Sequence, residues 1–217
     1  MTRQFALFDL DDTLVDTSGA YARWAAEFTE HHRLPADSID WLLLAPKALP
    51  GPKDRLLTAA KSRFALRDTV DELWSRYRRR MPELIRTRPG VLEGLERLRN
   101  TGWILGIVTN GAHDNQLGKI LSTGLAECVN GICISGEVGL RKPDPRIFHL
   151  AARRSQTESA VGGWMIGDDP DLDIRGGQAA GMKTCWVTHD RQWESAEIHP
   201  DTSALDTQDA IDLLLSA

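Results

Sequence analysis

Two acidic residues, Asp9 and Asp11, follow the short apolar segment Phe5–Phe8 near the start of the chain. Carboxylates this close repel each other unless a cation or a proton lies between them. The pair therefore suggests a metal site, a shared proton, or a nucleophile beside an acid/base residue. An acidic turn after a strand is the simpler alternative, because Asp is common in turns and helix caps.

A second apolar segment, Ile104–Val108, ends in Thr109, Asn110 and Gly111. A Thr hydroxyl, an Asn amide and the open backbone at a glycine are donors that can hold phosphate oxygens without adding charge. An ordinary Asn-Gly turn would have the same sequence.

A third feature is Lys142, which is followed by Pro143 and Pro145. A proline fixes its own φ and restricts the residue before it, so the lysine is held by a stiff backbone just after it. A point ammonium suits the neutralisation of a phosphoryl group or of crowded carboxylates. A solvated surface lysine would be equally at home in this loop.

Four acidic residues follow a third apolar segment, Trp164–Gly167; they are Asp168, Asp169, Asp171 and Asp173. This density of like charge is costly unless a divalent metal or a lysine compensates it. Ligands that offer only oxygen select a hard ion, so the sequence points to Mg²⁺.

Together these features resemble the haloacid dehalogenase superfamily. Its four motifs match, in order, Asp9–Leu14, Thr109–Asn110, Lys142, and Gly167–Asp168 with Asp173. The resemblance covers nearly the whole chain. The segment from Lys142 to Phe148 looks like the phosphatase-like branch, in which a helical cap is inserted after the first motif. Each motif alone is weak, and their order is what carries the resemblance.

The resemblance implies a role for each catalytic residue. Asp9 would be the nucleophile that takes the phosphoryl group as an aspartyl phosphate. Asp11 would protonate the leaving oxygen and then deprotonate the attacking water. Thr109 and Asn110 would bind the phosphoryl oxygens, and Lys142 would hold Asp9 and offset the negative charge.

The resemblance also implies a Mg²⁺ site. Asp168 would bind the ion together with Asp9 and the backbone carbonyl of Asp11, and Asp173 would act through a water or orient Lys142.

Two positions depart from the family pattern. Asp12 stands where many relatives have Gly, and we interpret it as a turn or cap residue. Asp169 stands where Ser is more usual, and we expect its side chain to face solvent.

The alternation of strands and helices after Pro89 predicts an α/β fold, a Rossmann-like parallel sheet in three layers. We expect a core from residues 1–15 and 89–217, with residues 16–88 as an inserted α-helical cap. Five strands are predicted, beginning near Gln4, Ile104, Gly131, Gly163 and Lys183. The resemblance implies that the first is central, with the strands of the second and fourth motifs beside it.

Substrate choice is expected in the cap, because the four motifs address only the phosphoryl group. Lys53 and Arg55, near the Leu49–Pro52 break, are candidates for substrate contact. A group of arginines between Arg76 and Arg88 is another, unless it is only a solvated helix face.

Composition fits a small enzyme. The 217 residues suffice for one core and an insertion, and the net charge of −5 gives no reason to expect nucleic acid. Three cysteines without metal-ligand spacing disfavour disulfides and zinc. With neither a signal segment nor a membrane-spanning run in the sequence, we expect a cytoplasmic monomer or homodimer.

The leading functional hypothesis is a Mg²⁺-dependent phosphatase of small phosphorylated metabolites. A phosphomutase and a non-catalytic phosphometabolite-binding protein are the alternatives. A 2-haloacid dehalogenase ranks last, since similar dehalogenases lack an acid two positions after the first Asp, where this chain has Asp11.

Overall fold

A computed structural model describes residues 4–48 and 53–216. The chain divides into two compact units, each considered separately below. One is the helical segment Thr17–Ile85, which falls inside the predicted insertion 16–88. The other combines the residues up to Asp16 with those from Arg86 onward, and it carries the sheet.

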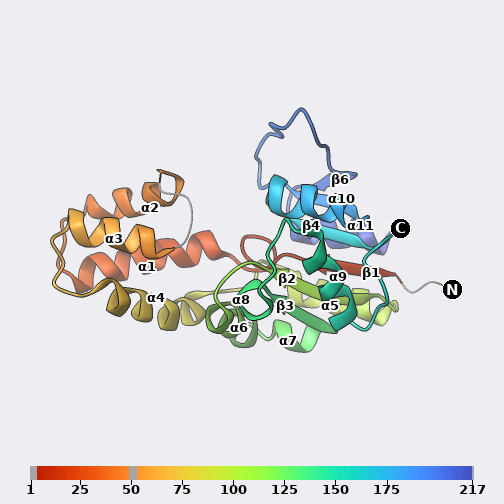
Figure 1. The fold of residues 1–217 in the computed structure, drawn as a ribbon, viewed down its shortest axis with the longest axis horizontal. Helices are drawn as coiled ribbons and strands as arrows, with labels where there is room; N and C mark the ends of the chain where they lie inside the picture. The colour runs from red at the N-terminus through yellow and green to blue at the C-terminus, as the bar shows by residue number, and fades with distance from the viewer. Residues whose placement is uncertain (1–3, 49–52, 217) are drawn as a thin grey trace. The chain divides into compact units, whose positions relative to one another are not determined.

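The larger unit contains one parallel sheet of six strands in the order β3-β2-β1-β4-β5-β6 (Figure 1). The strands are β1 Phe5–Phe8, β2 Ile104–Thr109, β3 Gly131–Ile134, β4 Trp164–Gly167, β5 Lys183–Val187 and β6 Thr202–Ala204. All six strands pair in parallel. The prediction that the first strand lies between those of the second and fourth motifs is confirmed.

The prediction of five strands was wrong by one, because β6 pairs with β5 at the edge of the sheet. This strand has only three residues, Thr-Ser-Ala, and they form no apolar run. Sequence periodicity gives no signal for so short a strand. Its place in the sheet depends on hydrogen bonding to β5.

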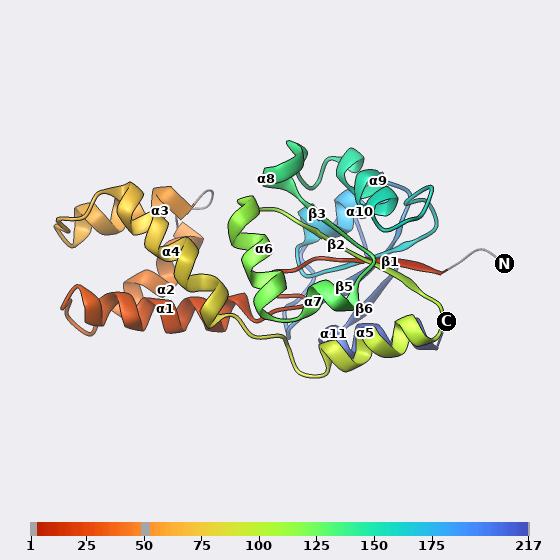
Figure 2. The same cartoon turned by 90° about the horizontal axis from the view of Figure 1, so that it is seen from below.

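Helices cover both faces of the sheet, which gives three layers. Helices α9 (Pro145–Arg154) and α10 (Gly176–Ala179) lie on one face, and α5 (Val91–Asn100) and α11 (Thr207–Leu215) lie on the other (Figure 2). Strands β1 and β2 are buried along their whole length, as expected for a sheet covered on both sides. The α/β class predicted from the sequence is therefore confirmed.

The apolar core on the α9 side joins the strands to that helix. It is made of buried aliphatic, aromatic and sulfur side chains, including Leu7, Val108, Phe148, Met165 and Met182. Burial of such side chains contributes most of the stabilisation of a domain this size. The strands are thereby fixed, and their carboxyl ends form a rigid edge.

Four short helices follow strand ends or loops in this unit. They are α6 (His113–Ser122), α7 (Leu125–Cys128), α8 (Ser135–Val138) and the π-helical turn η1 (Pro170–Arg175). Helix α6 begins four residues after β2, and η1 begins three residues after β4. Side chains at their first turns are therefore placed at the carboxyl edge of the sheet.

The helical unit consists of α1 (Thr17–His31), α2 (Ser38–Ala48), α3 (Lys53–Arg63) and α4 (Val70–Leu84). One face of α4 is buried, with Leu73, Tyr77 and Met81 among its residues. Trp74, on the same helix, is only half-buried. Trp24 packs against Tyr77 with ring centroids 5.0 Å apart, so this tryptophan is a core residue.

Two extended segments bound the insertion within the sheet-containing unit. Val15 forms an antiparallel bridge with Thr87, and the Arg88 amide donates to the Leu14 carbonyl at 3.0 Å.

In the described ranges 4–48 and 53–216, every helix is too short or too polar to cross a membrane.

Candidate active site

The predicted site residues follow the carboxyl ends of three adjacent strands. Asp9 comes directly after β1, Thr109 ends β2, and Asp168 comes directly after β4. Because β2, β1 and β4 are neighbours in a parallel sheet, these ends meet at one edge. In open α/β sheets, ligands bind at this edge, near the point where strand order reverses.

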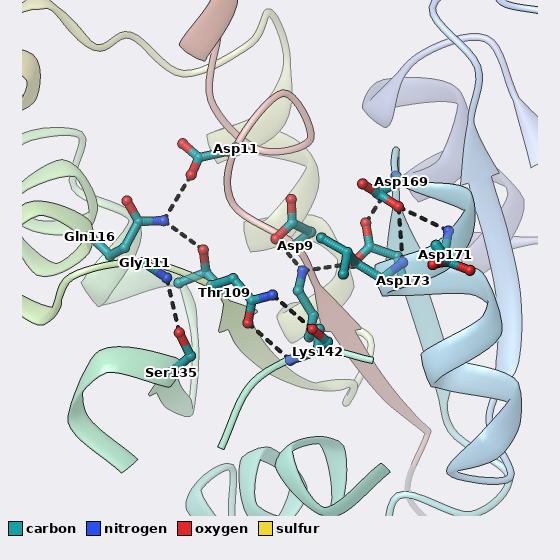
Figure 3. Close-up of polar contacts among 12 residues, drawn as sticks. Asp9, Asp11, Thr109, Gly111, Gln116, Ser135, Lys142, Asp169, Asp171 and Asp173 are labelled. Carbon is teal, nitrogen blue, oxygen red and sulfur yellow. Dashed lines mark hydrogen bonds and ion pairs between the residues drawn. The ribbon is translucent and has the colours of Figure 1, made fainter. Parts of the chain in front are cut away.

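The centre of the site is the ammonium of Lys142, which lies between two carboxylates (Figure 3). Lys142 Nζ lies 2.5 Å from Asp9 Oδ1 and 2.6 Å from Asp173 Oδ1. Asp173 is fully buried, and Asp9 and Lys142 are exposed by only 6% and 2%. A buried charge needs a partner, and here one cation is shared by two anions.

Burial and charge act in opposite directions on these groups. Burial raises the pKa of Asp9 to about 7, with Lys142 opposing the shift and the charge of Asp173 adding to it. Burial likewise raises the pKa of Asp173. Burial alone would lower the pKa of Lys142, but the two carboxylates outweigh it and raise that pKa above its ordinary value. The lysine is therefore a fixed cation.

The backbone of Lys142 is held by the side chain of Asn110. The Asn110 amide nitrogen donates to the Lys142 carbonyl at 3.0 Å, and the Asn110 carbonyl oxygen accepts from the Lys142 amide at 2.9 Å. The expectation that Asn110 binds phosphoryl oxygens stays a prediction, and one proton of its side-chain amide is used in this contact. In the structure that amide joins β2 to the lysine loop.

The main-chain amide of Gly111 also has a protein partner. It donates to Ser135 Oγ at 3.0 Å, at the start of α8, rather than being open toward a ligand (Figure 3). The Gly111 carbonyl accepts from the Gly136 amide at 3.0 Å, and a Cβ on Gly136 would lie 2.5 Å from that oxygen. The glycine at 136 therefore permits the close approach of α8 to the end of β2.

Asp11 has partners different from those of Asp9. Its carboxylate accepts from Lys119 Nζ at 2.6 Å and from Gln116 Nε2 at 2.8 Å. Gln116 Nε2 also donates to Thr109 Oγ1 at 2.6 Å. The sequence predictions included neither Gln116 nor Lys119, although their spacing of three residues on α6 places both on one helix face.

Asp168 is fixed by β5 and the loop after it. Arg191 Nη2 lies 3.1 Å from Asp168 Oδ2, and the Trp186 indole donates to the Asp168 carbonyl at 2.9 Å. Burial raises the pKa of Asp168 to about 7, with the charge of Asp9 adding to the shift and Arg191 opposing it. Arg191 was also missed, because a loop cation has no periodic signal.

The two residues that depart from the family pattern are both structural. Asp169 Oδ1 accepts from the amides of Asp171 and Leu172, each at 2.9 Å, so Asp169 caps η1. The residue is half-buried, and the expectation of a side chain facing solvent did not include this capping role. Asp12 has a φ of 55°, and its carbonyl lies 2.6 Å from His189 Nε2. Its turn role follows from this left-handed backbone, which Asp tolerates.

Gly167 at the end of β4 is required by the packing of Asp173. A Cβ at residue 167 would lie 2.2 Å from Asp173 Oδ2. The same Asp173 oxygen accepts from the Asp169 amide at 3.1 Å. The absence of a side chain at residue 167 is what lets Asp173 reach under the strand end to Lys142.

A hard divalent cation fits the carboxylates at this edge. Among the described residues, carboxylate oxygens of Asp9, Asp168 and Asp173 lie within 4.8 Å of one another. Both oxygens of Asp173 already accept hydrogen bonds from Lys142 and Asp169. Asp9 and Asp168 therefore have the chemistry of direct ligands. Burial, together with the charge of nearby carboxylates, raises their pKa values, so a bound cation would stabilise their ionised forms.

The two basic residues proposed for substrate contact belong to α3. Arg55 is exposed on that helix. The side chain of Lys53 and the Leu49–Pro52 break lie outside the described residues.

Comparison with known proteins identifies relatives over most of the chain. A family model described as haloacid dehalogenase-like hydrolase matches residues 6–187. The glyceraldehyde 3-phosphate phosphatase of Pyrococcus furiosus is 33% identical over 199 residues, which cover 86% of this chain and 81% of the relative. The phosphoserine phosphatase of Thermus thermophilus is 39% identical over 132 residues, covering 60% of this chain and half of the relative.

Solved structures agree with this result. The Bacillus subtilis protein YfnB, crystallised with magnesium, aligns with a TM-score of 0.81 at 25% identity and covers 99% of both chains. Structures of dehalogenases also match. The fold therefore does not separate phosphoryl transfer from dehalogenation, and the site residues must do so.

Proposed function

The chain belongs to the family of haloacid dehalogenase-like hydrolases, and on that basis we propose that it is a Mg²⁺-dependent phosphatase of small phosphomonoesters. The observation that carries the proposal is the pair of carboxylates at the end of β1. Asp9 contacts Lys142, whereas Asp11 contacts Lys119 and Gln116. Two carboxylates in two environments suit a nucleophile and a separate acid/base.

In the first step, a carboxylate oxygen of Asp9 attacks phosphorus, and the bond from phosphorus to the leaving oxygen breaks. The leaving oxygen takes a proton from Asp11 and departs as an alcohol. Lys142 holds Asp9 Oδ1 in place, so the attacking group enters with little freedom to rotate. The product of this step is an aspartyl phosphate on Asp9.

In the second step, water attacks the phosphorus of the aspartyl phosphate. Asp11, now ionised, takes the proton of that water, and the bond from phosphorus to Asp9 breaks. Inorganic phosphate leaves and Asp9 is restored as a carboxylate. One residue serves as acid and then as base, which returns the site to its starting state.

The phosphoryl oxygens would be bound by the Thr109 hydroxyl and balanced by the Lys142 ammonium. Asn110 contributes by holding the main chain of Lys142. Asp9, Asp168 and the Asp11 carbonyl would hold Mg²⁺, which supplies positive charge against the phosphoryl group when bound. Asp173 would keep Lys142 in position.

The names of the relatives support a small substrate. They are called phosphoserine phosphatase and glyceraldehyde 3-phosphate phosphatase. We extend only the shared class, a phosphomonoester of a small metabolite, to this chain. Lys53 and Arg55 stay proposed contacts for the rest of that molecule.

The contacts of Asp11 argue against dehalogenation. A dehalogenase needs its first carboxylate to attack carbon, and it has no leaving oxygen to protonate. Asp11 would then lack a chemical role, yet an ion pair with Lys119 and a hydrogen bond from the Gln116 amide hold its carboxylate.

The proposal is tested by phosphate release from a panel of phosphorylated metabolites, with and without Mg²⁺. Release that requires Mg²⁺ and disappears in Asp9→Asn supports the phosphatase. No release from any compound, with a folded protein that still binds Mg²⁺, would reject it.

Mg²⁺ binding is expected to weaken as pH falls below about 7. Without metal, Asp9 and Asp168 have pKa values raised from 3.8 to about 7, so below that pH both carry protons that the ion must displace. The apparent affinity should fall about tenfold per pH unit for each displaced proton. Calorimetric titration in buffers with different heats of ionisation measures the affinity for Mg²⁺ and the number of protons that the ion displaces. Equal affinities at about pH 6 and about pH 8 would contradict this account of the ligands.

A further inference from the structure

Two side chains of α6 contact groups that the proposed mechanism uses, yet have no step of their own. Lys119 Nζ lies 2.6 Å from Asp11 Oδ1, and Gln116 Nε2 lies 2.8 Å from Asp11 Oδ2. The same Gln116 nitrogen lies 2.6 Å from Thr109 Oγ1 (Figure 3). One face of α6 therefore contacts both the proposed acid and a proposed phosphoryl ligand.

The Lys119 ammonium is deeply placed for a charged group. The residue is 3% exposed, whereas the side chain of Asp11 is 32% exposed. A buried ammonium is costly without an anion, so the ion pair with Asp11 accounts for its position. Because donors contact both carboxylate oxygens, rotation of the Asp11 side chain is restricted.

The orientation of the Gln116 amide follows from its partners. A carboxylate can only accept, so the amide nitrogen must face Asp11 and its two protons serve Asp11 and Thr109. The Thr109 hydroxyl thus accepts from Gln116, and its own proton is directed to another acceptor. A phosphoryl oxygen is a fitting acceptor for that proton.

We propose that Lys119 and Gln116 are positioning residues for the two halves of the reaction site. Lys119 fixes Asp11 for proton transfer to the leaving oxygen, and Gln116 directs the Thr109 hydroxyl toward the phosphoryl group. The inference rests on the proposed phosphatase function. It assigns α6 a role that the four sequence motifs do not contain.

The two roles can be separated by the choice of substrate. An alkyl phosphomonoester releases a basic alkoxide that needs a proton, whereas para-nitrophenyl phosphate releases a stable phenolate that does not. The value of kcat/KM reports events up to phosphoryl transfer and is independent of the later attack by water. The alkyl-to-aryl ratio of kcat/KM therefore measures how well Asp11 donates its proton.

Lys119→Met is expected to lower kcat/KM for a small alkyl phosphomonoester about 10-fold to 100-fold, part of what general acid catalysis provides. The value for para-nitrophenyl phosphate should change less than about threefold, since its leaving group needs no acid. Equal losses for both substrates would show a merely structural role. No loss, or a gain with the alkyl ester, would show that Lys119 does not position Asp11. Each of these results overturns the proposal.

Two further variants serve as controls for a general loss of structure in Lys119→Met. Lys119→Arg keeps the charge and should restore most of the alkyl-to-aryl ratio. Lys183→Met removes an exposed lysine at the start of β5, where the strand enters the sheet, and should leave the ratio unchanged. If Lys119→Met does not fold, the charge-retaining Lys119→Arg and the Gln116 variant still provide the test.

Gln116→Leu addresses the phosphoryl half of the proposal. It should weaken competitive inhibition by inorganic phosphate about tenfold, because the Thr109 hydroxyl loses the hydrogen bond that directs its proton. The alkyl-to-aryl ratio of kcat/KM should fall less than in Lys119→Met, since the ion pair between Lys119 and Asp11 stays. Unchanged inhibition by phosphate would contradict the role of Gln116.

Failure of the proposed function would be visible before any variant is compared. If the wild-type protein releases no phosphate from either substrate, the phosphatase proposal fails. If it releases phosphate from both and Lys119→Met leaves the ratio unchanged, only the inference about α6 fails.

Discussion

Asp9→Asn is expected to lower phosphate release about ten-thousandfold or more, to the limit of detection. The amide is nearly the same size as the carboxylate, so the packing around Asp9 should be kept. An amide is a poor nucleophile, however, and cannot form the aspartyl phosphate. Labelling by beryllofluoride, which mimics a phosphoryl group on a carboxylate, should be lost as well.

A matched control for this variant is Asp209→Asn, an exposed aspartate in the first turn of α11. It should keep the wild-type rate. Mass spectrometry should show that residue 9 is still Asn, since conversion back to Asp would restore activity. Substantial turnover by a verified Asp9→Asn protein would remove Asp9 from the role of nucleophile.

Lys142→Met is expected to abolish turnover and to destabilise the protein. The variant removes the one cation that contacts both Asp9 and Asp173 among the described residues. Loss of one partner from a buried ion pair costs about 3–5 kcal/mol, because the other charge is left uncompensated. Urea unfolding without Mg²⁺ would measure the change.

The cost of Lys142→Met should also depend on pH. Burial already raises the pKa values of Asp9 and Asp173 in the folded state, and removal of the lysine raises them further. Between the pKa of the unfolded state and the raised pKa of the folded state, such a carboxyl binds a proton only when the protein is folded. The free energy of unfolding therefore falls as pH rises through this range. The loss should therefore be smaller at about pH 5 than at about pH 8.

The exposed Lys183 offers a control for this measurement. Lys183→Met should change the free energy of unfolding by at most about 1 kcal/mol, because it removes only an exposed contact with the Trp164 ring. An equal and small effect of both substitutions would mean that Lys142 is not the counterion of the buried carboxylates.

The sheet was predictable because its strands carry continuous apolar runs that end in chemically distinctive residues. Asp9, Thr109 and Asp168 each follow such a run, and parallel pairing then brings the three together. β6 lacked the run, and its position depends on pairing with β5. Sequence pattern thus predicted the strands that carry the site and missed the edge strand.

The contacts inside the site were less predictable, because polar side chains can serve several partners. The Asn110 side chain could bind phosphate, a main chain or both, and its contact with the main chain of Lys142, 32 residues away, depends on the fold. Lys119 and Gln116 are polar residues on a helix, a pattern that usually indicates a solvated face. Only the packing of α6 beside Asp11 makes them buried partners.

The central claim is that a phosphoryl group passes through Asp9, and rapid acid quenching during turnover tests it most directly. Quenched protein would be digested and the modified peptide located by mass spectrometry. We expect an acid-stable, base-labile acyl phosphate on the peptide that contains Asp9, absent from the Asp9→Asn protein. Phosphate release without a phosphoryl group on Asp9, or with one on a different residue, would contradict the account.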